Sequence, residues 1–189
     1  MSDKVSEASE AIEAATENKR VALLIAALAL ALALTEVAGD DAKTEAQMRN
    51  VESANLWAFF QARTIRQTVL GAEADRASVD AAQTADPAAR ASLEQQAQRW
   101  RATMARWESE PETGEGRREL TARAQRAEAA RDHAMKEDGR YDAAAALLQV
   151  AIVLASAGII TGMIALAWAA GALGVAGVAI SAATFLGLI

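Results

Sequence analysis

The sequence predicts an all-α fold: three transmembrane helices, with a long, coiled-coil-like helical hairpin between the first and the second. Two long apolar stretches lie toward opposite ends of the 189-residue chain, and residues 141–189 contain no Lys or Arg. The region between them is charged and repeats its apolar positions at helical spacing. Only two prolines occur, and β-branched runs are few outside the apolar stretches. Helices are therefore favoured throughout.

The first predicted span covers residues 19–38 and follows an acidic tail over 1–18. Val21 to Leu34 is fourteen apolar residues without interruption, which approaches the ~20 residues that cross a ~30 Å hydrocarbon core. Glu36 falls near an interface, where a carboxylate costs less than at mid-bilayer. A cleaved signal peptide is the alternative. Residues 1–20, which include Lys19 and Arg20, carry a net charge of −2, whereas signal peptides begin with a short positive region, so we favour an uncleaved anchor.

Two further spans are predicted over 141–161 and 166–188, with a break near Thr161-Gly162. Residues 143–189 are forty-seven positions without a charge, too many for one span and without a polar face to meet water. Small residues recur every four positions in the last span, which lets helix backbones approach closely in lipid. Gly171, Gly174 and Gly177 are therefore candidate subunit contacts, with packing inside the chain as the alternative.

Residues 39–140 are predicted to form a water-soluble helical segment. They hold 16 Lys and Arg against 18 Asp and Glu. Asp86-Pro87 ends the first helix of this segment, because proline cannot continue a helix and restricts the residue before it. A second helix carries Trp100 and Trp107 on one stripe. Residues 110–116 have the composition of a loop, and a third helix runs from about 117.

A heptad seam is predicted on the first helix of this segment. Its members step by three and four positions throughout: Met48, Val51, Asn55, Ala58, Ala62, Ile65 and Val69. A polar Asn inside such a seam commonly fixes register or strand number. We therefore expect Asn55 to direct the assembly of several copies.

Aromatic residues concentrate at Trp57, Phe59 and Phe60, and Arg63 and Arg66 follow about one turn later. Aromatics on several sides of one helix indicate packing against more than one neighbour. We favour structural packing or oligomer contact for these five residues. The alternatives are an anion site, since Arg beside aromatic rings suits planar anions, and docking of a partner protein.

The motif SNLWAFFQARTIRQT, with KRVALLIAALALALALTE before it and RYDAAAALLQVAIVLASAGIITG after it, resembles the bacterial membrane-protein family called domain of unknown function 4337. The resemblance runs from about Lys19 to Ile189. It implies one span, a helical segment and then two spans. It implies no activity and no catalytic residues.

The sequence excludes several classes of function. The net charge of −6 gives no clustered basic face for nucleic acid. The chain has no cysteine and a single histidine, so thiol chemistry and multi-histidine metal sites are absent. No nucleotide loop, nucleophile elbow or metal-ligand spacing occurs. We therefore expect neither an enzyme nor a cofactor.

The expected location is the bacterial inner membrane, with lipid as a constant partner. Basic residues before the first span favour a cytoplasmic N-terminus, whereas those before the second favour a cytoplasmic helical segment. Charge bias is weaker beside long soluble segments. We give the first span more weight and expect the helical segment and the C-terminus to be periplasmic.

Three functions fit these observations. The leading hypothesis is a homo-oligomeric structural or interaction scaffold that assembles through the segment containing Asn55. The second is an oligomeric channel or transport-linked protein with Glu36 near one mouth, although ion pathways normally carry more polar residues inside the membrane. The third is an adaptor that binds another membrane complex.

Overall fold

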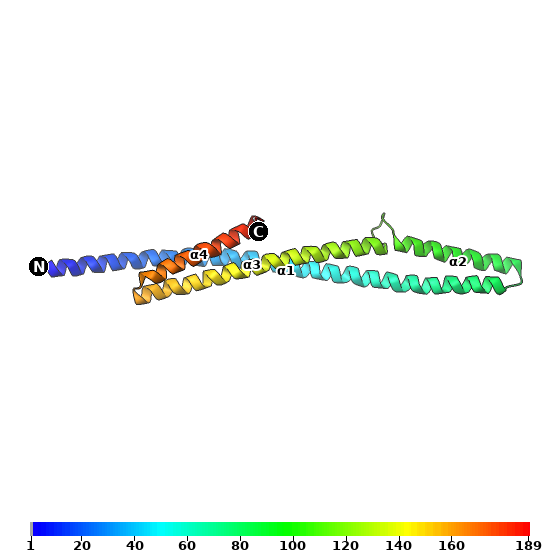
Figure 1. Ribbon diagram of the computed structural model, residues 1–189, viewed down its shortest axis with the longest axis horizontal. Helices are drawn as coiled ribbons and strands as arrows, with labels where there is room; N and C mark the ends of the chain where they lie inside the picture. The colour runs from blue at the N-terminus through cyan, green and yellow to red at the C-terminus, as the bar shows by residue number, and fades with distance from the viewer. Residues whose placement is uncertain (1) are drawn as a thin grey trace. The chain divides into compact units, whose positions relative to one another are not determined.

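The computed structural model describes residues 2–189, with side chains from Lys19 onward (Figure 1). Its helices are α1 (Ser2–Gln83), α2 (Pro87–Glu108), α3 (Arg117–Thr161) and α4 (Ile164–Phe185). The described residues contain no strand, so the predicted all-α class is confirmed. The acidic tail predicted over 1–18 lies outside the residues whose side chains are described.

The helices end at the positions that the sequence indicates. Asp86 caps α2, because its carboxylate accepts a hydrogen bond from the Ala88 N–H at 3.0 Å, and Pro87 occupies the first turn. The break between α3 and α4 contains Gly162, whose φ of +68° is a left-handed conformation that favours glycine.

The chain divides into two compact units, and each is described by itself. The first, here called the apolar unit, comprises Met1–Glu45 and His133–Ile189. In it α1 and α4 run in the same direction, since Gly174 packs on Leu28 and Ser181 lies 3.0 Å from Thr35. The α3 helix runs the opposite way, because its Gly158 end approaches the start of α4.

Three helices are long and apolar enough to cross a membrane, judged by length and composition: α1 over Lys19–Gln83, α3 and α4. This agrees with the three predicted spans. The apolar unit has a core of Leu28, Leu148 and Ala151, against which further aliphatic side chains pack. The C-terminal residue lies at the same end of this unit as Arg140, whose guanidinium donates to the Ile189 carbonyl oxygen at 2.6 Å.

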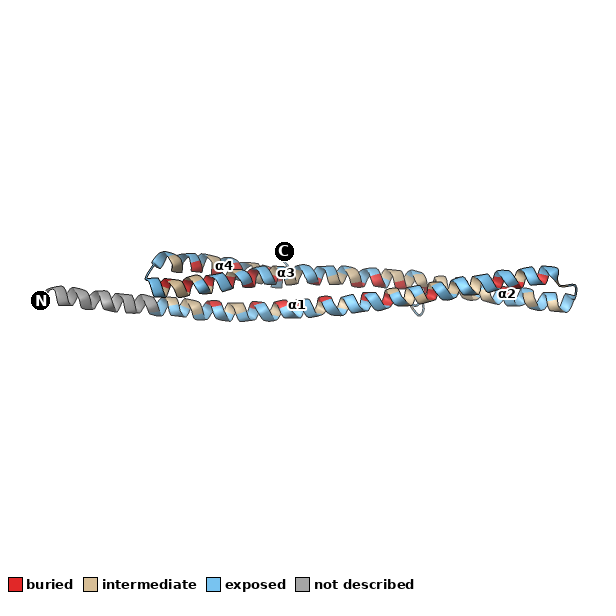
Figure 2. Cartoon of the chain, turned by 90° about the horizontal axis from the view of Figure 1, so that it is seen from below, coloured by how far each residue is buried: buried red, intermediate tan, exposed pale blue. Residues whose placement is uncertain are grey.

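The second unit, here called the hairpin unit, is Ala46–Asp132. It contains the second half of α1, all of α2 and the first turns of α3. The buried residues of α1 fall on one row, visible in Figure 2, that repeats in steps of three and four. This inner row comprises Ala46, Arg49, Ser53, Leu56, Phe60, Arg63, Gln67, Leu70, Ala74, Ala77 and Ala81. The α2 stripe packs as predicted: Ala97 is buried, and Trp100 and Trp107 are half-buried.

The predicted heptad seam is not the face that α1 buries within the chain. Every member lies two positions beyond a member of the inner row, which is roughly 200° around the helix. Met48, Val51, Ile65 and Val69 are 56%, 58%, 65% and 58% exposed. The inner row thus repeats in the same steps of three and four as the predicted seam. The predicted residues, however, lie on the face opposite to the one that packs within the chain. The inner row consists mainly of small and polar residues, whose hydropathy gives little sign of burial.

Candidate functional site

The most extensive candidate site is the exposed face of α1 in the hairpin unit, here called the outer seam. The seven predicted positions continue C-terminally at the same spacing through Ala72, Arg76 and Val79. Val79 is 54% exposed. The seam spans about 45 Å at ~1.5 Å per residue. It presents aliphatic side chains to the outside at heptad positions over more than four heptads, which is the arrangement that a partner helix covers.

Trp57, Phe59 and Phe60 pack inside the hairpin unit. They contact a buried cluster that contains Leu56 of α1 and Leu120 of α3. The Trp57 and Phe60 rings meet edge to face, with centroids 5.6 Å apart. The Trp57 indole N–H donates to the Glu128 carboxylate at 2.8 Å. These aromatics therefore make structural packing within the chain, which is one of the two favoured interpretations, and their contact with another subunit stays a prediction.

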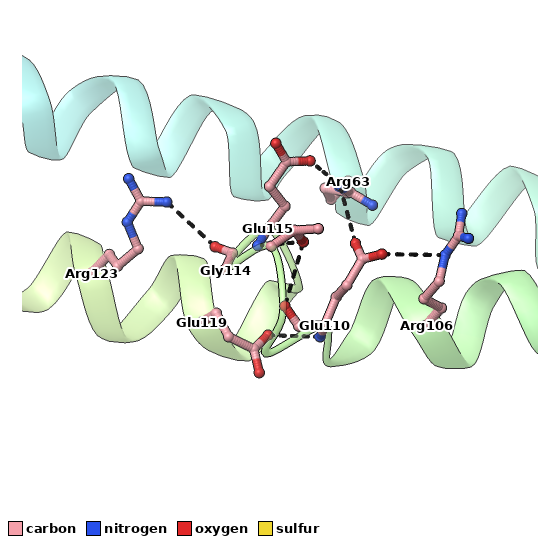
Figure 3. A network of polar contacts seen from close by, with 8 residues as sticks. Arg63, Arg106, Glu110, Gly114, Glu115, Glu119 and Arg123 are labelled. Carbon is pink, nitrogen blue, oxygen red and sulfur yellow. Dashed lines mark hydrogen bonds and ion pairs between the residues drawn. The ribbon is translucent and has the colours of Figure 1, made fainter.

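Arg63 also pairs with carboxylates of the same chain (Figure 3), although its Nε is buried without a hydrogen-bond partner among the described residues. It is 8% exposed, and its guanidinium lies 2.8 Å from Glu115 and 3.9 Å from Glu110, both in the loop before α3. The same group lies over the rings of Phe59 and Trp107, at 5.3 and 5.7 Å from their centroids. Two carboxylates already neutralise the Arg63 guanidinium. It therefore has no free positive charge to bind an anion, which argues against the alternative of an anion site at Arg63.

Arg66 differs from Arg63, although it lies only three residues further on. It is exposed, and no described residue forms an ion pair with it. It borders the outer seam rather than the inner row. The prediction of an intermolecular contact therefore stays open for Arg66.

A second stacked arginine supports the aromatic cluster. Arg117 lies 5.0 Å from the centroid of the Phe60 ring. Its guanidinium donates to the Gln67 side chain at 2.9 Å and to Glu108 at 3.1 Å. Sequence reasoning missed Arg117 and the role of Glu128, because neither belongs to a motif and only the packing of α3 on α1 brings them to the cluster.

The loop between α2 and α3 is closed by Glu119 (Figure 3). Its carboxylate accepts hydrogen bonds from the Ser109 hydroxyl at 2.7 Å and from the Glu110 N–H at 3.1 Å. The Ser109 hydrogen bond is the main cause of a lowered pKa at Glu119. Desolvation opposes it as the second-largest effect, and the Glu110 N–H lowers the pKa further. Glu119 is therefore held as a carboxylate that fixes the loop.

The glycines of α4 separate into two groups. A Cβ on Gly177 would lie 2.9 Å from Leu148 and 3.0 Å from the Ala144 carbonyl oxygen, and one on Gly174 would collide with Leu28. Both are buried against helices of the same chain, which agrees with the alternative of packing inside the chain at these two positions. Nothing lies within 4 Å of a Cβ on Gly171, which stays a candidate contact.

Glu36 lies at the surface of the apolar unit, and its carboxylate is 3.4 Å from the Gln149 side-chain nitrogen. It lines a cavity of about 240 Å³ with Lys43, near the end of the unit where Ile189 lies. Among the described residues, no group of three or more His, Cys, Asp or Glu side chains could hold a metal ion.

Comparison with known proteins identifies a family. The family described as domain of unknown function 4337 matches residues 17–187. No curated protein and no solved structure shows a significant match to the chain. Because the match covers nearly the whole sequence, the chain belongs to the domain of unknown function 4337 family.

Proposed function

We propose that this chain is a self-assembling scaffold of the bacterial inner membrane, held by its three spans and assembled through the outer seam. The observation that supports this most is the exposure of Met48, Val51, Ile65 and Val69 on one heptad face. Burying aliphatic surface contributes about 25 cal/mol per Å². A face that repeats over more than four heptads is therefore suited to a helical partner.

The partner that best fits the outer seam is the same seam of a second copy. Copies anchored in one membrane share one orientation, so their α1 helices would run parallel. A parallel pair sets each heptad position against its own counterpart, and Asn55 would then face Asn55. Two side-chain amides can hydrogen-bond to each other, and a register shifted by one heptad would leave them unpaired.

Charges along the outer seam fit the same arrangement. Arg76 occupies a seam position, and Asp75 and Asp80 flank it in sequence. In a parallel pair the guanidinium of one copy would reach Asp80 of the other, which offsets the cost of a cation in the seam. We further propose that the N-terminus is cytoplasmic and that the hairpin unit is periplasmic.

The absence of cysteine makes disulfide crosslinking a direct test. Ala58 and Ala129 are exposed alanines, on the outer seam and on α3 respectively. We expect Ala58→Cys to give a crosslinked dimer in membranes under mild oxidation and Ala129→Cys to give none. Equal crosslinking of the two variants, or none in either, would contradict pairing through the outer seam.

Two other functions are distinguished by further measurements. A channel or transport-linked protein would conduct ions in liposomes, and Glu36→Gln would alter that flux. An adaptor would co-purify in fixed stoichiometry with a different membrane protein, and its outer seam would crosslink to that protein instead of to itself.

A further inference from the structure

Two cavities meet at one end of the apolar unit. The larger, of about 480 Å³, lies mainly between α1 and α4 and is lined by aliphatic and aromatic side chains that include Leu34, Val178 and Phe185. The smaller, of about 240 Å³, lies between α1 and α3. Both are lined by Thr35 and Tyr141, so the two cavities lie next to each other at these two residues.

Tyr141 lines both cavities and has a side-chain hydroxyl without a hydrogen-bond partner among the described residues. It is 7% exposed. Close approach of α1 holds it in place, because a Cβ on Gly39 would lie 3.2 Å from the Tyr141 Cβ. The hydroxyl oxygen is not one of the fully buried side-chain atoms that lack a partner, so it is accessible from the cavities. An acceptor oxygen entering there would receive its hydrogen bond.

Thr35 differs from Tyr141 in this respect. Its hydroxyl lies 2.9 Å from the Ala31 carbonyl oxygen and 3.0 Å from the Ser181 hydroxyl. It needs no further partner. Of the two hydroxyls that line both cavities, only that of Tyr141 therefore lacks a hydrogen-bond partner in the described part of the chain.

The smaller cavity has a mixed but mainly acidic lining. Its ionisable residues are Glu36, Asp40, Asp138 and Asp142, with Lys43 as the cation. No three of these carboxylates lie close enough for a metal ion. These carboxylates can accept hydrogen bonds from an organic cation, whereas Lys43 and the Tyr141 phenol can donate to an anion. The ligand that satisfies both groups carries a phosphate and an amine.

We propose that these cavities bind one phospholipid with a primary-amine headgroup, of the phosphatidylethanolamine class. The larger cavity takes part of an acyl chain. The phosphate oxygens accept a hydrogen bond from the Tyr141 hydroxyl and pair with Lys43, and the ammonium group donates to carboxylates such as Asp142. A free amino acid or a phosphate would leave the apolar cavity unfilled, and a quaternary ammonium headgroup has no N–H to donate.

The order of the cavities along α1 fits a lipid. The apolar cavity begins at Ala31, and the polar cavity extends to Lys43. The two linings overlap between Thr35 and Asp41, and only the polar cavity reaches Lys43, so the charged lining extends further toward the end of the predicted span. A membrane lipid changes from acyl chain to headgroup in the same direction.

The test uses the full chain in mixed nanodiscs that contain equal amounts of phosphatidylethanolamine, phosphatidylcholine and phosphatidylglycerol. Native mass spectrometry then counts the lipids that stay bound to the protein after it is released from the nanodiscs. We expect about ten times more phosphatidylethanolamine than either of the other lipids to stay bound. A preference of this size is what a hydrogen bond to a charged group contributes. Tyr141→Phe keeps the ring and should lose most of this preference.

Controls separate binding from folding. Trp168→Phe alters an aromatic residue outside both cavities and should leave the preference unchanged. The helical circular dichroism of all variants should be the same. Asp142→Asn should weaken retention of phosphatidylethanolamine without weakening that of phosphatidylglycerol. Equal retention of the three lipids, a preference for phosphatidylglycerol, or an unchanged preference in a folded Tyr141→Phe variant would overturn the proposal.

Discussion

The two faces of α1 between Ala46 and Gln83 share one heptad spacing but differ in chemistry. The inner row packs against α2 and α3 with small, aromatic and charged side chains. The outer seam carries aliphatic side chains, and the described part of the chain leaves more than half of the surface of Met48, Val51, Ile65, Val69 and Val79 exposed. Most aliphatic residues larger than alanine therefore lie outside, contrary to the usual distribution, although Leu56 and Leu70 lie on the inner row.

This difference shows that the face of α1 that packs against α2 and α3 is the one whose side chains fit theirs in shape and charge. Alanine at Ala74 and Ala77 allows α2 to approach closely, and Arg63 is buried because Glu115 and two aromatic rings satisfy it. The apolar unit follows the same rule with glycine, since Gly177 admits Leu148. Close approach and paired charges stabilise these faces more than residue hydropathy suggests.

The largest expected effect is at the inner face. Leu120 is completely buried, so Leu120→Ala should lower the free energy of unfolding of the hairpin unit by about 2–5 kcal/mol. Ile65→Ala on the outer seam should change it by less than about 0.5 kcal/mol when each nanodisc holds one chain. Tryptophan fluorescence during denaturant unfolding reports both values. Similar losses would break the distinction between the faces.

The glycines of α4 offer a matched pair in the apolar unit. Gly177→Leu forces a side chain against Leu148 and the Ala144 backbone, which should cost about 1–3 kcal/mol or more. Gly171→Leu enters open space and should be tolerated. Thermal unfolding followed by circular dichroism in nanodiscs compares the two. Equal melting temperatures would show that α4 does not pack on α3 through Gly177.

Arg63 and Arg66 form a matched pair across the two faces. Arg63→Met leaves Glu115 without its cation, whereas Glu110 keeps Arg106. It should destabilise the hairpin unit by about 1–2 kcal/mol, less than the loss of a fully buried pair, because Glu115 is half-exposed. Arg66→Met should leave unfolding unchanged. A larger effect at Arg66 than at Arg63 in isolated chains would reverse the assignment of the faces.

The smallest expected effect is a pH dependence at the loop. Hydrogen bonds lower the pKa of Glu119 below its usual 4.5, so the folded state favours the carboxylate. Its contribution is present above the unfolded pKa and is lost as the pH falls through the lower, folded value. The free energy of unfolding should decline between pH 6 and pH 3, and this decline should be smaller in the Glu119→Gln variant. An identical decline in that variant would assign it to other carboxylates.

The helices and their breaks could be predicted from the sequence because local signals encode them. Pro87 with its Asp86 cap, the loop before Arg117 and Gly162 each mark an end. The covered face of α1 could not be predicted, since alanine, serine and glutamine give no hydropathy signal. It depends on partners such as Leu120 and Glu128, which lie more than sixty positions away from Leu56 and Trp57.

The candidate site divides in the same way. The period of the outer seam and the position of Asn55 within it could be predicted from residue spacing alone. The roles of Arg63, Gly174 and Gly177 could not, because spacing does not tell whether a close contact is made within a chain or between chains. Tyr141 has no signal of its own, since its cavities arise only when three helices meet.

The central claim is that copies of this chain assemble through the outer seam, and the native mass of the full chain extracted into nanodiscs tests it most directly. We predict a species with several copies and no other protein for the natural sequence, and a single copy for the Val51→Lys, Ile65→Lys double variant. A single copy of the natural chain, a fixed complex with a different protein, or a double variant that assembles as well as the natural chain would contradict the claim.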